Sequence, residues 1–464
     1  MRAPRLATAI GLALTVAAPS ARAQAPLDAI DSLVRAEQAR QRIPGVAVLV
    51  VRRDSVLLAR GWGEANVEHA VPVTDETFFQ SGSVGKQFTA ALVLLLAEEG
   101  RLRLDDRAVR WLPSLGPRWR GVTIRHLLTH TSGIPDYGDA TLDLRREYTE
   151  AALVRLAARL EPEFAPGARW AYSNTGYVLL GCIIRQATGR FYGDLLRERL
   201  FTPLGMATAR VISDAAIVPH RAAGYELAGD SLRNQAWVSP SLNTTADGSL
   251  YLSLRDYAAW DRALRRGALL SASSWQAATT PATLRSGARV PYGFGWAVDT
   301  VGGQPVFRHG GAWQGFRTSI ARYQGRDVTV VVLANLAQAA PEDIGDRIAQ
   351  LVDPALVPTA GEEDPDPAGT EAALRTLLAR TAAGRLARAD FAWAPAGFFP
   401  AAPARYAARL RPLGAVQAVR ALRTARLGDD RIWQHEVRFA GGALFVETAR
   451  APDGRLTRFR FRPL

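Results

Sequence analysis

Strand-like segments lie at both ends of residues 27–352, and a mostly helical stretch separates them. The segment GVAVLVVRRDSVLLARGWGEANVE predicts a hairpin whose turn lies near Arg53 and Asp54. After residue 290 the strand pattern returns in YGFGWAV, PVFRHGG, GFRTSIARY and DVTVVVLANL. Helical patterns flank these strands, in LDAIDSLVRAEQARQRI before them and PEDIGDRIAQLV after them. This order predicts an α/β (α+β) fold, in which an antiparallel sheet is flanked by terminal helices and a helical second lobe is inserted between its strands.

A smaller second unit is expected at the end of the chain. Residues 353–369, DPALVPTAGEEDPDPAG, are rich in proline and acidic residues and are interpreted as a linker. Beyond it, residues 370–390 have a helical pattern, and residues 431–464 alternate as a meander of strands does. The expected organisation is therefore a leader at 1–25, a main domain at 26–352, the linker, and a small α+β tail domain at 370–464.

The first 25 residues have the three parts of a secretory signal peptide. Arg2 and Arg5 form a basic head, residues 6–18 are an apolar run too short to span a bilayer, and residues 21–25, ARAQA, contain a small-residue cleavage site. No cysteine stands directly after the apolar run, and no later segment reaches membrane-spanning length. We expect an exported protein, periplasmic or secreted after cleavage, with no stable membrane anchor.

Composition narrows the expected partners. The chain has 464 residues, of which 48% are hydrophobic and 22% charged, as in ordinary globular proteins. The formal net charge is +13, but the arginines are spread along the chain without a basic block, so no nucleic-acid partner is expected. Cys182 is the single cysteine and lies in the apolar run YVLLGCIIRQA, which favours a buried structural thiol over a nucleophile.

Lys86 is the only lysine among 57 basic residues, and it lies in FFQSGSVGKQFTAALVLLLAEEG. Ser83 precedes it by three positions at the start of an expected helix over residues 84–99, so both side chains share one helix face. A serine hydroxyl becomes a good nucleophile when a neighbouring group removes its proton. Arginine does not deprotonate in proteins, whereas burial can lower the pKa of a lysine enough for it to do so. The alternative is that Ser83 only caps the helix and Lys86 is solvated.

Two further motifs accompany this pair. WAYSNTGYVLLG contains Tyr172, Ser173 and Asn174, and FRHGGAWQGFRTSI contains the tripeptide His309 to Gly311. Taken alone, the first fits a helix entry with a capping residue, and the second a strand end that needs glycine. Together with S-x-x-K and the loop TIRHLLTHTSGIPDY, they resemble the serine β-lactamase and penicillin-recognising family, in the branch of class C β-lactamases, DD-peptidases and related esterases. The resemblance covers about residues 27–352.

The resemblance implies a β-lactamase/transpeptidase-like fold, a role for each motif residue and no cofactor. Ser83 would attack a carbonyl and form an acyl-enzyme, with Lys86 holding it and helping to take its proton. Tyr172 would be the phenol or phenolate partner, with a pKa lowered by nearby cations so that it activates the deacylating water. Asn174 would orient Lys86 and the substrate. The backbone N–H groups of Ser83 and Ala312 would form the oxyanion hole.

The third motif departs from the Lys-Thr/Ser-Gly pattern of the lactamases in that family. His309 replaces the lysine and Gly310 replaces the hydroxyl residue, with Gly311 completing the set of expected substrate-binding positions. A histidine with an ordinary pKa is mostly neutral at pH 7, so the grip on a substrate carboxylate is weakened. We therefore expect an exported serine hydrolase acting on esters, small amides or peptides, with a D-Ala-D-Ala carboxypeptidase or weak β-lactamase as the alternative.

Other interpretations remain open at this stage. A non-catalytic protein could use the same groove to bind penicillin or a peptide, and the tail domain could serve cell-surface interactions. The GDSL at 229–232 matches a lipase motif but is interpreted as a hairpin turn. SVGKQ lacks the residues of a phosphate-binding loop. His126 and His130 are four apart without H-E-x-x-H, so both are assigned structural roles and no metal is expected.

Overall fold

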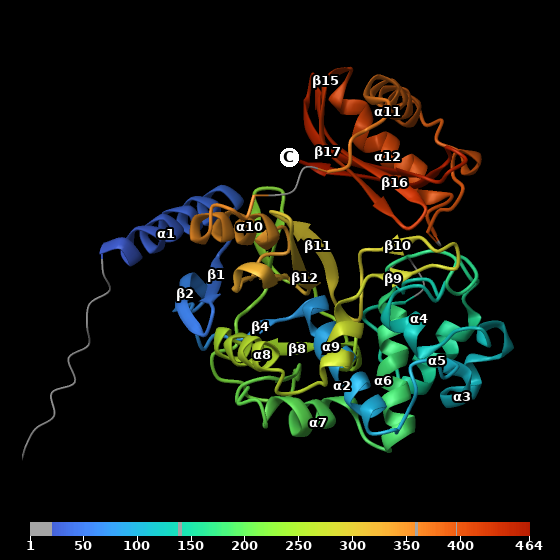
Figure 1. Ribbon diagram of the computed structural model, residues 1–464. Helices are drawn as coiled ribbons and strands as arrows, with labels where there is room; N and C mark the ends of the chain where they lie inside the picture. Colours follow the sequence, from blue (N-terminus) through green and yellow to red (C-terminus); the bar gives the residue numbers. More distant parts are fainter. Residues whose placement is uncertain (1–20, 138–141, 358–360, 396) are drawn as a thin grey trace, which may run out of the picture.

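A seven-stranded antiparallel sheet joins the two strand-rich parts of the chain (Figure 1). The computed structural model describes residues 21–137, 142–357, 361–395 and 397–464. Most of the predicted signal peptide, residues 1–20, lies outside the described residues. The strands of the sheet, in spatial order, are β11 (Ala297–Val301), β12 (Gln304–Trp313), β13 (Phe316–Tyr323), β14 (Val328–Ala334), β1 (Gly45–Arg52), β2 (Ser55–Asn66) and β3 (Val71–Pro72).

The central strand β1 is buried on both faces, which explains its unbroken apolar sequence GVAVLVV. Val46, Val48 and Val50 pack with the terminal helices α1 (Ala21–Gln41) and α10 (Pro341–Val352), which lie side by side in Figure 1. Ala47 and Leu49 face the other way. They join the larger core that contains α2 (Lys86–Glu98) and α8 (Leu254–Arg266). The predicted sheet flanked by terminal helices is confirmed.

The segment between the two groups of strands folds largely into helices, which form the second lobe. Buried apolar side chains of these helices continue the core of the sheet's inner face. The helices are α3 (Ala108–Trp111), α4 (Ile124–Leu128), α5 (Glu150–Arg159), α6 (Asn174–Thr188), α7 (Tyr192–Leu196) and α9 (Ala272–Thr279). Short strands connect them: β4 (Phe79–Gln80), β5 (Arg210–Val211), β6 (Tyr225–Ala228), β7 (Ser231–Asn234), β8 (Leu250–Leu252), β9 (Ala282–Thr283) and β10 (Arg289–Val290).

Several predicted elements need correction. The expected strand at 292–298 is mostly loop, because Gly295 has a φ of +73° and β11 begins only at Ala297. The expected helix at 84–99 begins as an α-helix at Lys86, after a 3-10 turn over Gly82–Gly85. The GDSL segment is a hairpin turn between β6 and β7, as predicted.

The tail forms a second unit with its own core. Its helices pack against one face of a four-stranded antiparallel sheet, with Leu378, Val446 and Phe459 among the buried residues. α11 begins within the expected linker, and α12 and β15 come from residues for which no element was predicted. The elements are α11 (Pro367–Ala382), α12 (Ala401–Leu410), β15 (Val416–Leu427), β16 (Asp430–Phe439), β17 (Gly442–Arg450) and β18 (Leu456–Pro463).

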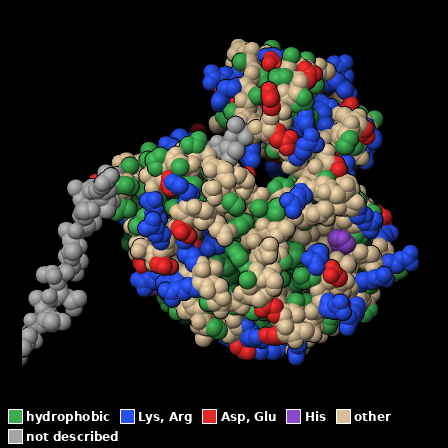
Figure 2. Space-filling view, in the orientation of Figure 1, with side chains coloured by type: hydrophobic (Ala, Val, Ile, Leu, Met, Phe, Trp, Pro, Cys, Tyr) green, Lys and Arg blue, Asp and Glu red, His purple; other side chains and the backbone are tan. Residues whose placement is uncertain are grey.

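Charged side chains are mixed over the surface. In Figure 2 basic side chains are scattered across the visible face, with acidic side chains among them. Many of the arginines are paired with carboxylates, as in the Arg347–Glu37 contact between the terminal helices. The helices in the described ranges include none with the length and apolar character needed to cross a bilayer.

Candidate active site

Ser83 and Lys86 meet at the point where the 3-10 turn passes into α2. In a 3-10 turn, side chains three positions apart lie above one another. This places the Lys86 Nζ 3.0 Å from the Ser83 Oγ, to which it donates a hydrogen bond. Ser83 is half-buried and lines a cavity, whereas Lys86 is fully buried beneath it. The local geometry therefore gives the serine a neighbouring amine that solvent does not reach.

The Lys86 amine is held by two further acceptors from distant parts of the chain. It donates to the Asn174 Oδ1 at 2.6 Å and to the backbone carbonyl of Asp247 at 2.5 Å. Burial lowers the pKa of Lys86 to about 8, and the carboxylates of Asp247 and Asp136 oppose part of this shift. A neutral amine keeps two N–H groups for Asn174 and Asp247, and its lone pair can then accept the Ser83 proton.

Tyr172 lies against the same amine. The Lys86 Nζ is 5.0 Å from the centre of the Tyr172 ring, and the Tyr172 hydroxyl is buried. Burial raises the pKa of Tyr172 well above its ordinary value, although the nearby Ser83 hydroxyl opposes the rise. The expectation that cations lower this pKa is therefore wrong: the phenol is neutral and can act as a proton donor.

His130 packs against the Tyr172 ring. Their ring centres are 4.3 Å apart, and the Ser173 backbone N–H donates to the His130 Nδ1 at 3.1 Å. Burial lowers the pKa of His130 well below its ordinary value, and the nearby Lys86 charge lowers it further. His130 is thus a neutral ring in the packing around Tyr172. His126 caps α4 through Thr123, so both histidines have structural contacts.

Asn174 begins helix α6, and its side-chain amide is fixed by Asp136. The Asn174 backbone N–H donates to the Asp136 Oδ1 at 2.9 Å, and its Nδ2 donates to the Asp136 Oδ2 at 3.1 Å. Because the Nδ2 is engaged in this way, the Asn174 Oδ1 is left to accept from Lys86. Ser173 caps the same helix, with its hydroxyl accepting from the Gly176 N–H. The YSN motif therefore serves both the helix start and the site.

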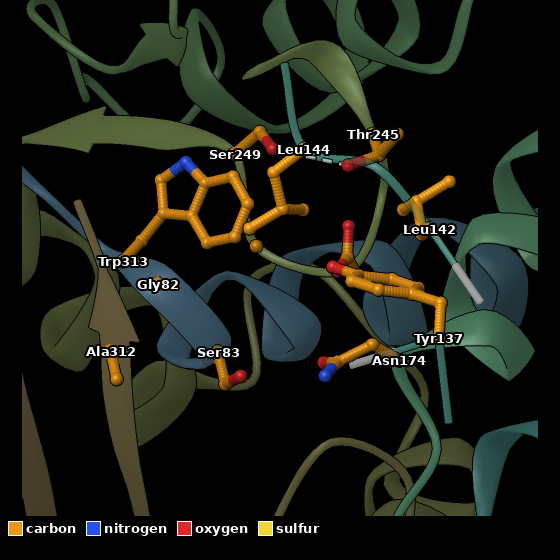
Figure 3. A pocket seen from close by; sticks show the side chains of 12 residues that line it. Gly82, Ser83, Tyr137, Leu142, Leu144, Asn174, Thr245, Ser249, Ala312 and Trp313 are labelled. Carbon is orange, nitrogen blue, oxygen red and sulfur yellow. Dashed lines mark hydrogen bonds between the residues drawn. The ribbon is translucent and has the colours of Figure 1, made fainter. Parts of the chain in front are cut away.

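The backbone at Gly82 passes directly against β12. Gly82 has a φ of +49°, and a Cβ there would lie 2.4 Å from the Ala312 nitrogen, so only glycine allows this approach. Ser83 and Ala312 consequently line the same side of the cavity (Figure 3). This places the two backbone N–H groups that were predicted to form the oxyanion hole beside one cavity.

His309 lies on β12 but does not line the cavity. The Gly310 carbonyl accepts from the His309 Nδ1 at 2.7 Å, so the Tyr292 hydroxyl donates to the Nε2 at 2.8 Å. Burial, with a smaller contribution from the charge of Lys86, lowers the pKa of His309 to about 4. The ring is neutral at pH 7 and offers no fixed cation. Gly310 and Gly311 pack against Glu342 and Ser81, away from the cavity.

The cavity in front of Ser83 has a volume of about 270 Å³. Figure 3 shows Trp313, Leu144, Leu142 and Tyr137 around it, on the side away from Ser83 and Ala312. Asn174 reaches it from α6, and the segment Thr245 to Ser249 forms another wall. Of the residues predicted from sequence, Ser83, Asn174 and Ala312 line the cavity, with Lys86 and Tyr172 buried next to it.

Sequence reasoning missed the two carboxylates of the site. Asp136 lies in the loop TIRHLLTHTSGIPDY, whose sequence predicts no role for it, and it orients Asn174. Asp247 lies within a polar stretch, SLNTTADG, that has no distinctive spacing from the other motifs. Its carboxylate accepts a hydrogen bond from the Tyr137 hydroxyl. Only the tertiary fold brings these residues to Lys86.

The fold and this arrangement of serine, lysine and tyrosine define a serine hydrolase. The family model described as "Beta-lactamase" matches residues 30–353. The chain belongs to that family, and the resemblance noted in its motifs is confirmed.

Two curated relatives show where the similarity lies. The chain is 33% identical over 305 residues to "Penicillin-binding protein 4*" of Bacillus subtilis, covering 62% of this chain and 67% of that protein. It is 32% identical over 320 residues to "D-aminopeptidase" of Gluconobacter oxydans, covering 67% of this chain and 59% of that protein. The chain thus spans about three fifths of the length of this D-aminopeptidase.

Solved structures share the fold. The D-amino acid amidase from Ochrobactrum anthropi SV3 superposes with a TM-score of 0.63 and 25% identity, covering 71% of this chain and 99% of that one. The octameric penicillin-binding protein homologue from Pyrococcus abyssi has a TM-score of 0.64 and 22% identity, covering 94% of this chain and 99% of that one. The second likeness concerns the fold alone, and it extends into the tail.

Proposed function

We propose that this protein hydrolyses small amides, short peptides and esters through an acyl-enzyme formed on Ser83. The observation that carries the proposal is the buried Lys86 amine, with a pKa of about 8, placed 3.0 Å from the Ser83 hydroxyl. Such an amine can accept a proton near neutral pH, whereas an ordinary solvated lysine cannot. A binding protein without catalysis would have no need for it.

The first half of the reaction uses the groups around Ser83. Neutral Lys86 takes the proton from the Ser83 hydroxyl as its oxygen bonds to the substrate carbonyl carbon. The negative charge on the carbonyl oxygen is met by the backbone N–H groups of Ser83 and Ala312. The bond from the carbonyl carbon to the leaving group then breaks. The leaving nitrogen or oxygen receives its proton from Lys86, directly or through the Tyr172 hydroxyl.

A neutral Tyr172 makes amide hydrolysis chemically reasonable. An amine leaving group must be protonated as it departs, and a buried phenol with a raised pKa keeps its proton for that step. Water then adds to the acyl group on Ser83, and the acid is released as the serine regains its proton. The names of the D-aminopeptidase and D-amino acid amidase relatives support D-amino acid amides as substrates. Esters, which leave more easily, are expected to react through the same steps.

The third motif favours this proposal over a carboxypeptidase or an efficient β-lactamase. Those substrates carry a carboxylate, and neutral His309 and side-chain-free Gly310 give it no cation or hydroxyl. A purified enzyme can be tested on D- and L-alanine p-nitroanilide, p-nitrophenyl acetate and nitrocefin, with Ser83→Ala as control. We expect turnover of the ester and of the anilide of the preferred enantiomer to exceed that of nitrocefin. A fluorophosphonate probe should label Ser83 in mass spectrometry, and absence of an adduct would contradict the proposal.

Export remains part of the proposal and rests on the sequence of the first 25 residues. Export is supported by the basic head, the short apolar run and the small-residue cleavage site. Expression with the native leader in a bacterial host should yield a shortened protein in the periplasm or medium. Its first residue is expected to be Gln24 or Pro26, which N-terminal sequencing would determine.

A further inference from the structure

Asp247 is the feature of the cavity that the proposed chemistry leaves unused. Its backbone carbonyl accepts from Lys86, and the steps proposed above assign its carboxylate no role. The residue is 7% exposed and lines the cavity that contains Ser83. One carboxylate oxygen, Oδ2, accepts from the Tyr137 hydroxyl. The other, Oδ1, is buried and has no hydrogen-bond partner among the described residues.

A buried carboxylate oxygen without a partner is unfavourable, and a cationic donor entering the cavity would satisfy it. Among the described residues that line the cavity, Asp247 alone carries a formal charge. The other lining side chains are neutral, and they include the apolar Leu142, Leu144 and Trp313. The cavity therefore combines one negative charge with an apolar wall, which suits an ammonium group on a small apolar frame.

The position of Asp247 is fixed relative to the nucleophile. Gly248 packs on the 3-10 turn so closely that a Cβ there would lie 2.2 Å from the Gly82 carbonyl oxygen, and its own carbonyl accepts from the Ser81 hydroxyl at 2.8 Å. The Asp247 carbonyl is bonded to the same Lys86 amine that contacts Ser83. In an α-amino acyl substrate, one carbon separates the amine from the reacting carbonyl. Asp247 and Ser83 line the same cavity, so the carboxylate and the nucleophile face the same bound substrate.

We propose that Asp247 binds the ammonium group of substrates whose acyl part carries a free amine next to the scissile carbonyl. The assignment rests on the proposed function and adds its substrate class: unblocked α-amino amides and esters are accepted, and N-acylated ones are disfavoured. Tyr137 is a positioning residue, because its hydroxyl holds the carboxylate through Oδ2 and leaves Oδ1 for the substrate.

The wild-type enzyme provides the first test. D- and L-alanine p-nitroanilide are compared with their N-acetyl derivatives, which keep the same scissile bond and leaving group. We expect kcat/KM for the free amine of the preferred enantiomer to exceed that of its N-acetyl form by about 10- to 100-fold, as for loss of one charge-assisted hydrogen bond. Equal rates would overturn the assignment while leaving the hydrolase proposal in place. Turnover of no ester or amide would overturn both.

Asp247→Asn provides the second test, since an amide of the same shape can still accept from Tyr137. The free-amine to N-acetyl ratio of kcat/KM should fall about 10-fold or more toward unity. Using a ratio removes any effect on Lys86, which acts on both substrates alike. Asp230→Asn, an exposed residue of the β6–β7 turn, is the matched control and should keep the wild-type ratio. An unchanged ratio in Asp247→Asn would overturn the assignment.

Discussion

The Lys86 amine contacts the Ser83 hydroxyl from inside the protein, 3.0 Å away and with no exposed surface of its own. A 3-10 turn connects the two residues and places their side chains above one another. Burial makes the charged form of Lys86 costly, and this is what shifts the amine toward a base.

Replacement of Lys86 by arginine keeps a positive charge but removes a group that can give up its proton. We expect Lys86→Arg to lower kcat/KM for a p-nitrophenyl ester by about 10²- to 10⁴-fold, the range for loss of a general base. Steady-state kinetics of the purified variant measures this. The reverse change at an exposed position, Arg101→Lys, is the matched control and should leave the rate unchanged. Activity of Lys86→Arg near the wild-type level would show that Lys86 does not act as the general base.

The pH dependence should report the same amine. Since Lys86 must be neutral to accept a proton, kcat/KM is expected to rise with pH along a limb with an apparent pKa of about 8 and to level off above it.

The same shift affects the stability of the fold, because the unfolded chain keeps the Lys86 proton up to its ordinary pKa. The Lys86 contribution to the free energy of unfolding therefore increases between about pH 8 and 10.5.

The variant Asp136→Asn tests whether Lys86 sets this pH profile. The Asp136 carboxylate raises the pKa of Lys86, so Asp136→Asn should move the activity limb to lower pH. It should also lower kcat, because the amide would no longer hold Asn174 through two acceptors. A profile in which the wild-type rate falls as the pH rises from 7 to 9 would show that the protonated amine is the active form.

Much of the fold could be predicted because its elements have strong local patterns. The β1–β2 hairpin and helix α10 follow from apolar runs and from the turn at Arg53, which has a φ of +55°. Strand β15, VQAVRALRTARL, could not be predicted, because its Ala, Leu and Arg content is typical of a helix and most of the strand is exposed. Its strand conformation depends on pairing with β16.

Some residues of the site could likewise be predicted from the sequence, and others could not. Ser83, Lys86 and the YSN residues stand in short motifs and could be named from the sequence. Asp247 is 161 residues from Lys86 and could not, because the fold alone brings them together. The direction of the Tyr172 pKa shift depends on how deeply the hydroxyl is buried, and a sequence carries no measure of that depth.

Acid is expected to destabilise the protein through His309. Its folded pKa is about 4, so between pH 6.5 and 4 the unfolded chain binds a proton that the folded chain does not. The free energy of unfolding should therefore fall as the pH decreases through this window, by at most about 1.4 kcal/mol per pH unit for this residue. Urea unfolding at pH 7, 5.5 and 4.5 measures the slope, which should be smaller in His309→Gln. The exposed His69→Gln is the control, and an equal slope change there would contradict the assignment.

The tail contacts the segment that carries Tyr172. Asp430, at the start of β16, accepts from the Arg169 Nη1 through both oxygens, at 3.1 and 3.2 Å, and Arg169 precedes Tyr172 by three residues. The pair is largely buried, with side-chain exposures of 26% and 14%. The adjacent turn also bonds to the main domain, where the Gly428 N–H donates to the Arg289 carbonyl at 3.1 Å. The tail therefore restrains the chain segment that leads to Tyr172.

Asp430→Ala is expected to lower kcat roughly three- to tenfold, because small displacements of a catalytic group reduce the rate. The free energy of unfolding should fall by about 1–2 kcal/mol, and a double-mutant cycle with Arg169→Ala should assign most of that loss to the pair. Arg423 of the tail and Asp299 of β11 form a second contact between the tail and the main domain, at 3.1 Å. This contact provides the matched control. Arg423→Ala should affect stability without changing kcat. Equal losses of kcat in the two variants would mean that the tail acts on overall stability and not on Tyr172.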